Sequence, residues 1–106
     1  MNKLLSNFRI NNKQVGKNKN TYIIFEAGPT HNGLFSAKKL VDMARISGAD
    51  AIKFQILDKN LTSDPNQIFK YKYLTSKHKI KIMHEPLEKI LKRREMKMSD
   101  WEKLSK

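Results

Sequence analysis

The sequence predicts an α/β fold organised around a parallel strand–helix–strand unit. An almost continuous apolar run, "TYIIFEAG", occupies residues 21–28, and such runs are typical of strands buried on both faces of a parallel sheet. The segment "SAKKLVDMARISG" then has apolar residues at helical spacing, and "AIKFQIL" returns to strand character. Because all three lie within about 35 residues, they indicate one βαβ unit with parallel strands and a right-handed crossover.

The segment before this unit is predicted to form a small hairpin. In "FRINNKQVGKN" an Asn-Asn turn separates two short elements that each contain apolar residues, which is the pattern of two strands with a tight connection. The 106 residues are enough for one small domain. We therefore divide the chain into an amino-terminal hairpin or extension, residues 1–20, and a main part, residues 21–106.

The first strand of the unit is expected to end at Gly28, and the helix is expected over Ser36–Ser47. Ser36 is the predicted N-cap because its hydroxyl can accept a hydrogen bond from a free backbone N–H. Gly48 is expected to close the helix, since glycine adopts the left-handed conformation that such an end requires. The apolar face consists of residues spaced three and four apart: Ala37, Leu40, Val41 and Ala44.

The second strand is expected over Ala51–Leu57, and periodicity is then lost until Met83. Lysines alternate with apolar residues in this part, which predicts one or two exposed edge strands or an excursion from the main fold. The segment "EPLEKILKRRE" is predicted to be helical, with Pro86 in its first turn. A further helix is expected at "SDWEKLSK", where Ser99 and Glu102 match the capping-box pattern.

The charge pattern bears on which partners the chain has. The net charge is +12. The chain has no cysteine, which excludes thiol chemistry and disulfides. The lysines are spread along the chain, without a dense basic arm, so nucleic-acid binding is disfavoured although charge alone attracts polyanions. No apolar run is long enough for a membrane span and the opening "MNKLLSNFRI" is no secretory signal. We expect a cytoplasmic protein without membrane contact.

Polar side chains meet on one face of the predicted sheet. Because strand side chains alternate between faces, Glu26 lies on one face of the first strand, and Lys53 and Gln55 share a face of the second. If the strands are neighbours, Glu26 and Lys53 meet near the carboxyl ends, where α/β folds place their ligand sites. Lys53 would then offset a carboxylate that is costly to bury alone. A purely structural ion pair is the alternative, and spacing does not decide between them.

Two other segments are candidates for function. His31 in "PTHNG" is a ligand, a proton shuttle or a turn residue, and the adjoining Asn-Gly pair favours a turn with positive φ. His78 and His84 are not spaced to form a cluster with it, so the sequence contains no metal site. The run Lys92–Glu95 can hold a phosphate or carboxylate, but a solvated helix face is the favoured interpretation.

The motifs "EAGPTHNG" and "AKKLVDMARISGADAIKFQ", and more weakly "LKRREMKMSDWEKL", together resemble the sialic acid synthase family. That resemblance covers residues 22–104, with a looser stretch in the excursion. It implies a transferase of nonulosonic acid and carbohydrate biosynthesis that condenses phosphoenolpyruvate with N-acetylmannosamine or a related sugar aldehyde. The family's complete barrel, a (β/α)₈ TIM barrel, needs about 250 residues, so this chain is expected to be an incomplete TIM-barrel fragment that holds the first β-α-β unit, the excursion and the start of the second helix.

The resemblance also assigns roles to individual residues. Glu26 matches the glutamate that contacts the sugar, Lys53 matches the lysine that contacts phosphoenolpyruvate, and Gln55 matches a residue beside the sugar site. Glu26 and Lys53 are thereby the implied catalytic residues. The family's divalent metal, manganese or magnesium, is held by histidines on later strands, so its ligands are expected to be absent from this chain.

The resemblance implies several partners for the complete enzyme: phosphoenolpyruvate, an N-acetylmannosamine-type sugar, a second copy in a homodimer, and a downstream chain if one completes the barrel. The isolated chain is expected to be inactive. The alternative function is a small basic binding protein that engages nucleic acid or a partner chain through its lysines.

Overall fold

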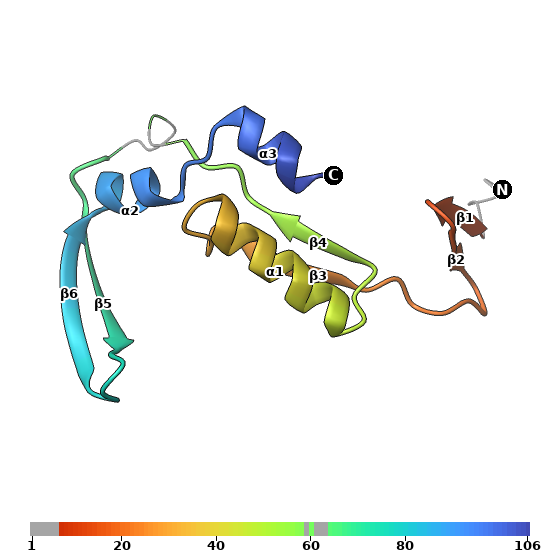
Figure 1. Cartoon of the computed structure of the whole chain (residues 1–106), viewed down its shortest axis with the longest axis horizontal. Helices are drawn as coiled ribbons and strands as arrows, with labels where there is room; N and C mark the ends of the chain where they lie inside the picture. The colour runs from red at the N-terminus through yellow and green to blue at the C-terminus, as the bar shows by residue number, and fades with distance from the viewer. Residues whose placement is uncertain (1–6, 59, 61–63) are drawn as a thin grey trace, which may run out of the picture.

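A computed structural model describes residues 7–58, 60 and 64–106. Figure 1 shows three groups of elements along the long axis: an amino-terminal hairpin, a central unit with the helices, and a second hairpin at the opposite end. The elements in chain order are β1 (Asn7–Ile10), β2 (Lys13–Gly16), β3 (Ile24–Gly28), α1 (Leu34–Ile46), β4 (Ala51–Phe54), β5 (Ile68–Leu74), β6 (Ile80–Pro86), α2 (Leu87–Arg94) and α3 (Met98–Leu104).

The central unit is the predicted strand–helix–strand arrangement. Strands β3 and β4 pair in parallel, with Ile24 opposite Ala51 and Glu26 opposite Lys53, and α1 connects them. The register shifts by one residue after Glu26, so that Gly28 pairs with Phe54. This irregularity is a β-bulge, which re-aims side chains at the end of a strand.

Helix α1 begins two residues earlier than predicted. Its N-cap is Gly33, with a φ of 88° and no side-chain cap. The carbonyl of Gly33 accepts the first helical hydrogen bond from the N–H of Ala37, at 3.1 Å. The prediction of Ser36 as N-cap is therefore wrong, because glycine already supplies the change of backbone direction and Ser36 lies inside the first turn.

The end of α1 matches the prediction for Gly48. This residue has a φ of 83°, and its N–H donates to the carbonyl of Arg45 at 3.1 Å. The next N–H, that of Ala49, donates to the carbonyl of Ala44 at 3.0 Å. Together these bonds form a Schellman motif, in which glycine takes the left-handed position and the last helical carbonyls are satisfied.

Both hairpins form where the sequence predicted exposed or isolated strands. Strands β1 and β2 are antiparallel, and Asn11 in their turn has a φ of 50°. Strands β5 and β6 are also antiparallel, in a continuous register from Ile68 opposite Pro86 to Leu74 opposite Ile80. From residue 68 onward the excursion is thus one long hairpin, which extends away from the helices (Figure 1). Residues 59 and 61–63 of the excursion lie outside the described residues.

The last two helices start later than expected or without the expected cap. Pro86 ends β6 in an extended conformation and is the N-cap of α2, so it is not in the first turn. The capping box of Ser99 and Glu102 is also wrong. Lys97 is the N-cap of α3, and its carbonyl accepts from the N–H of Trp101 at 3.2 Å, so Ser99 lies within the helix.

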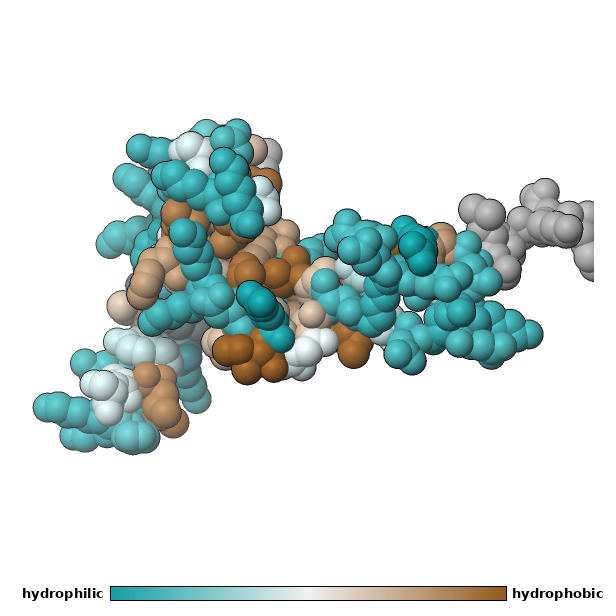
Figure 2. Space-filling model, turned by 45° about the vertical axis from the view of Figure 1, so that its right-hand side comes forward, coloured by the Kyte–Doolittle hydropathy of each residue, from teal (hydrophilic) through white to brown (hydrophobic). Residues whose placement is uncertain are grey.

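The chain as described buries little apolar surface. Its radius of gyration is 18.5 Å, against roughly 13 Å for a compact domain of this length. Among the described residues the buried apolar side chains are Ala37 and Ala44. The expectation of a strand buried on both faces is wrong, since Ile24 and Phe25 of β3 are 56% and 38% exposed. Figure 2 shows apolar side chains open to the surface in the middle of the molecule.

The exposure of β3 has a simple physical cause. A sheet of two strands has two open edges, and α1 and α3 lie against only one of its faces in the described structure.

No helix among the described residues has the length and apolar character that a membrane crossing needs.

Candidate functional site

The candidate site is built around the pair predicted from strand alternation. The Nζ atom of Lys53 lies 2.7 Å from Oε2 of Glu26, and the two residues are direct partners on parallel strands. Their side chains are 62% and 49% exposed, respectively, so the pair is open to solvent and is not the buried pair expected. The hydrogen bond from Lys53 lowers the pKa of Glu26, and the backbone N–H of Gly28 lowers it further against a partial desolvation.

Gly28 shapes the end of β3 around this carboxylate. Its N–H donates to Oε1 of Glu26 at 2.9 Å, and its φ of 53° is in the left-handed region. This conformation turns the backbone N–H back toward the side chain of its own strand, and residues other than glycine adopt it at a cost. Both carboxylate oxygens of Glu26 therefore have a donor.

Gln55 follows directly after β4. Its backbone N–H donates to the carbonyl of Gly28 at 3.2 Å, and alternation places its exposed side chain on the face of Lys53. The structure thus brings Glu26, Lys53 and Gln55 to one end of the two strands. An ammonium, a carboxylate and an amide at the carboxyl edge of parallel strands can bind a ligand that has both anionic and hydroxyl groups.

The opposite face of β4 is apolar and covered. Ile52 and Phe54 line a groove together with Val41 of α1 and Trp101 and Leu104 of α3. Helices α1 and α3 therefore lie against the face of β4 away from Lys53. This separation leaves the polar face free.

His31 lies in the loop between β3 and α1, next to the predicted turn, and its side chain packs into the interior. It is fully buried, and its ring makes edge contacts with Phe54 and Trp101 at centroid distances of 5.8 and 5.2 Å. Nε2 lies 2.8 Å from the carbonyl oxygen of Arg94, whereas Nδ1 has no hydrogen-bond partner in the described part of the chain. The positive φ that the adjoining Asn-Gly pair predicted is found at Gly33.

Arg94 joins the end of α2 to the loop after β3. Its guanidinium donates to the carbonyl of Pro29, and its own carbonyl is the partner of His31. The loop is thus attached to α2 at two points. Sequence reasoning missed this contact because His31 and Arg94 are 63 residues apart and neither lies in a motif that specifies the other.

The neighbouring Arg93 binds a carboxylate of its own chain. Its Nη1 and Nη2 donate to Oε2 and Oε1 of Glu85 at 2.6 and 2.5 Å, and the hydroxyl of Tyr71 donates to Oε1 at 2.5 Å. Arg93, and secondarily Tyr71, lower the pKa of Glu85 to about 2. Lys92 and Arg93 are exposed, as the favoured prediction of a solvated face requires, whereas Arg94 is partly buried. Arg93 also binds a carboxylate, which was the alternative interpretation of Lys92–Glu95.

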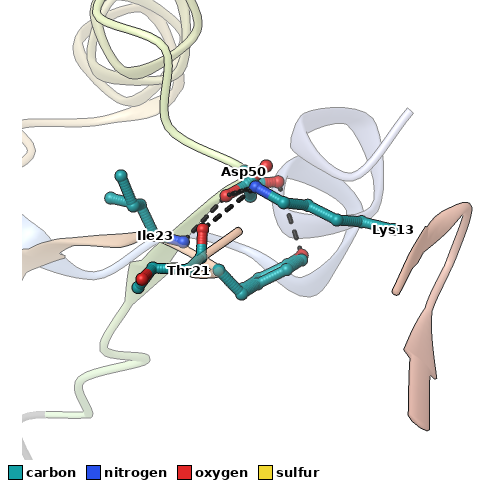
Figure 3. Close-up of polar contacts among 5 residues, drawn as sticks. Lys13, Thr21, Ile23 and Asp50 are labelled. Carbon is teal, nitrogen blue, oxygen red and sulfur yellow. Dashed lines mark hydrogen bonds and ion pairs between the residues drawn. The ribbon is translucent and has the colours of Figure 1, made fainter. Parts of the chain in front are cut away.

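Asp50, which the sequence analysis did not single out, links the amino-terminal hairpin to the central unit (Figure 3). Its Oδ2 accepts from Nζ of Lys13 at 2.6 Å and from the N–H of Ile23 at 2.8 Å. Lys13 also donates to the carbonyl of Thr21 at 3.1 Å. Lys13 and then Ile23 lower the pKa of Asp50. An aspartate between a helix-closing glycine and a strand was the only sequence signal for this role.

The residues that the structure describes do not fit a divalent metal. The described residues contain no group of three or more His, Cys, Asp or Glu side chains placed to hold one. Glu26 is already engaged by an ammonium and a backbone N–H. No step of the chemistry is therefore assigned to a metal bound by this chain.

Similarity to other proteins covers part of the chain. The chain is 48% identical over 61 residues to the spore coat polysaccharide biosynthesis protein SpsE of Bacillus subtilis. The matched residues are 55% of this chain and 16% of that protein. It is 54% identical over 52 residues to the N,N'-diacetyllegionaminic acid synthase of Legionella pneumophila, covering 47% of this chain and 15% of the relative. The synthase of the same name from Campylobacter jejuni is 60% identical over 38 residues, covering 35% and 11%.

No family model matches the chain. The matched residues span about one sixth of the first of these relatives or less. Two of the three relatives are named as synthases of N,N'-diacetyllegionaminic acid, and the third is named for spore coat polysaccharide biosynthesis. They confirm, for the part of the chain that they cover, the predicted kinship with the sialic acid synthase family.

Proposed function

We propose that this chain supplies the first part of the substrate site of a phosphoenolpyruvate-condensing synthase in nonulosonic acid biosynthesis. In this proposal Lys53 contacts phosphoenolpyruvate, while Glu26 and Gln55 contact N-acetylmannosamine or a related sugar aldehyde. The observation that carries it is the Glu26–Lys53 contact of 2.7 Å between paired parallel strands. This contact lies near the carboxyl ends of the strands, where α/β enzymes bind their ligands.

The exposure of this pair supports binding rather than a purely structural role. An ion pair that is half exposed contributes little to stability, and both partners remain accessible to a ligand. The ammonium of Lys53 can neutralise a phosphate or carboxylate, and the carboxylate of Glu26 can accept hydrogen bonds from sugar hydroxyls. Charge that develops as the carbon–carbon bond forms would be stabilised by the same ammonium.

The activity of a whole synthase would require further residues. The exposed apolar side chains of β3 and the two open sheet edges support an incomplete (β/α)₈ barrel, whose remaining strands cover these surfaces. We infer that the remainder, whether in the same polypeptide or in a separate chain, supplies the manganese or magnesium ligands. The complete enzyme would act in the cytoplasm as a homodimer.

Complementation tests this proposal. The chain is combined with the remainder of a related synthase, and phosphate release from phosphoenolpyruvate and N-acetylmannosamine is measured with manganese present. Condensation should appear only in the combined sample and should fall with Lys53→Met. Lys72→Met, which removes an exposed lysine from β5, is the matched control. Equal activity of the two variants would contradict the role of Lys53.

Polyanion binding remains the second candidate function, and one observation favours it. Between residues 65 and 84 the sequence has five lysines and no acidic residue, and the structure places them on the β5–β6 hairpin and its turn. Binding to single-stranded nucleic acid through these lysines should weaken steeply as salt rises. If the chain does not bind single-stranded nucleic acid even at low salt, this function is excluded.

A further inference from the structure

We propose that His31 is a positioning residue for Glu26, acting through Arg94 and the loop of residues 28–33. The inference deepens the proposed function, because it concerns how the carboxylate assigned to the sugar is held. His31 itself lies on the opposite, covered side of the strands, against Phe54 and Trp101. Its effect on Glu26 must therefore be transmitted through the backbone.

The first step is the contact between His31 and α2. A carbonyl oxygen can only accept a hydrogen bond, so the 2.8 Å contact between Nε2 of His31 and Arg94 requires the proton to be on Nε2. The aromatic neighbours hold the ring in the orientation that this bond needs. His31 therefore fixes its own position in the loop relative to the last residue of α2.

The second step is the return contact from Arg94. Its guanidinium donates to the carbonyl of Pro29, two residues before His31. Arg94 thus accepts from one loop residue and donates to another, and the two bonds together restrict both rotation and translation of the loop. Thr30, between them, donates through its hydroxyl to the carbonyl of Ala27 at 2.8 Å.

The third step connects the loop to the carboxylate. Pro29 directly follows Gly28, whose N–H holds Oε1 of Glu26 at 2.9 Å. Gly28 has a left-handed φ of 53°, and glycine moves readily between conformations when nothing holds it. Fixing the carbonyl of Pro29 limits that movement. The clamp of His31 and Arg94 therefore keeps the Gly28 N–H aimed at Glu26.

Two substitutions separate this role from simple packing. His31→Gln keeps an N–H donor near the position of Nε2, whereas His31→Phe keeps the bulk and aromatic contacts but removes the donor. His84→Phe, at an exposed histidine of β6, is the matched control. In each variant of the chain, the pKa of Glu26 is measured from its carboxyl carbon shift by NMR, together with hydrogen exchange of the Gly28 amide.

His31→Phe should raise the pKa of Glu26 toward its ordinary value, because the Gly28 hydrogen bond is weakened. Exchange of the Gly28 amide should become about tenfold faster, as expected when a local hydrogen bond opens more often. His31→Gln should restore most of both properties, and His84→Phe should change neither. An unchanged Glu26 pKa and Gly28 exchange in folded His31→Phe would overturn the proposal.

A second variant covers the case in which His31→Phe fails to fold. Arg94→Met leaves the ring cluster in place and removes only the guanidinium that holds Pro29. It should accelerate Gly28 exchange in the same direction, and unchanged exchange would again overturn the proposal. These measurements need no substrate, so their failure is distinct from a failure of the proposed condensation, which Lys53→Met tests.

Discussion

The central unit and the β5–β6 hairpin are held together in different ways. In the central unit, three side chains that are distant in sequence, His31, Phe54 and Trp101, meet edge to edge, and α1 and α3 lie against β4. The hairpin is stabilised mainly by its own ladder from Ile68 to Pro86. Its side-chain attachment to α2 is charged and lies at the end where β6 meets that helix.

The difference shows which part of the chain depends on tertiary packing. The hairpin's pairings are local, and its apolar residues Leu74 and Ile80 are 62% and 70% exposed. In the central unit, α1 and α3 lie against the face of β4 that is opposite the candidate site, and the site lies on the open face. Substitutions should therefore have different effects in the two regions.

The largest effect is expected on catalysis. The 106 residues alone should release no phosphate from phosphoenolpyruvate and the sugar, because catalysis by positioning fails when part of the site is missing. In a complemented assembly, Lys53→Met should lower turnover at least about tenfold. The hairpin variant Lys72→Met should have wild-type turnover. Metal-dependent condensation by the isolated chain would contradict the incomplete-barrel proposal.

The second prediction concerns thermal unfolding of the isolated chain. With Ala37 and Ala44 as the buried apolar residues of its described part, the chain should unfold broadly and with low cooperativity. Fluorescence of the single tryptophan reports the central unit, whereas far-UV dichroism also reports the hairpin. The two curves should not coincide. One sharp transition, identical for both probes in a monomer, would show that the two regions form one cooperative core.

Gly28→Ala should destabilise the central unit by about 1–2 kcal/mol, the cost of placing a side chain in the left-handed region. The added Cβ would lie 3.8 Å from Oε1 of Glu26, an ordinary contact, so strain rather than a clash is the cause. Urea denaturation followed by tryptophan fluorescence measures the effect. Asn11→Ala, which removes a positive-φ residue from the β1–β2 turn, is the control and should leave this signal unchanged.

The smallest expected effect is the loss of stability at low pH where the β5–β6 hairpin meets α2, at the contacts of Glu85 with Tyr71 and Arg93. The pKa of Glu85 falls from an ordinary 4.5 to about 2 in the folded chain. A lowered folded pKa means that the stabilisation is fully present above about pH 4.5 and is lost as pH falls toward 2. Tyr71 resonances should shift over that range in the wild type. In Glu85→Gln the shift should be absent, and its persistence would assign it to another carboxylate.

Sequence reasoning predicted the features that depend on local pattern. Strand alternation and the βαβ spacing placed Glu26 beside Lys53, and glycine at position 48 predicted the end of α1. It failed where two signals competed for one role, as at Ser36, because the preceding Gly33 started the helix first. Sequence reasoning also predicted that β3 is buried. An apolar run indicates that a strand can pack against other apolar elements, but it does not show that those elements are present.

The missed site residues have a common cause. His31 and Arg94 each read as a turn or a surface residue in their own segments, and only the folded chain brings them together. Glu85 and Arg93 are close in sequence, but their contact requires β6 to end and α2 to begin between them. Periodicity gives the face of a single element, whereas these contacts depend on the angle between two elements.

The contact between His31 and Arg94 also leads to an expectation about the order in which the chain folds. It joins residues 63 positions apart, so the loss of chain entropy on closure precedes any gain from packing. The two hairpins and α1 rely on neighbours in sequence and should form on a microsecond timescale, before this closure. The loop beside Glu26 would then be the last segment to order, and a kinetic probe at Gly28 should record the slowest phase of refolding.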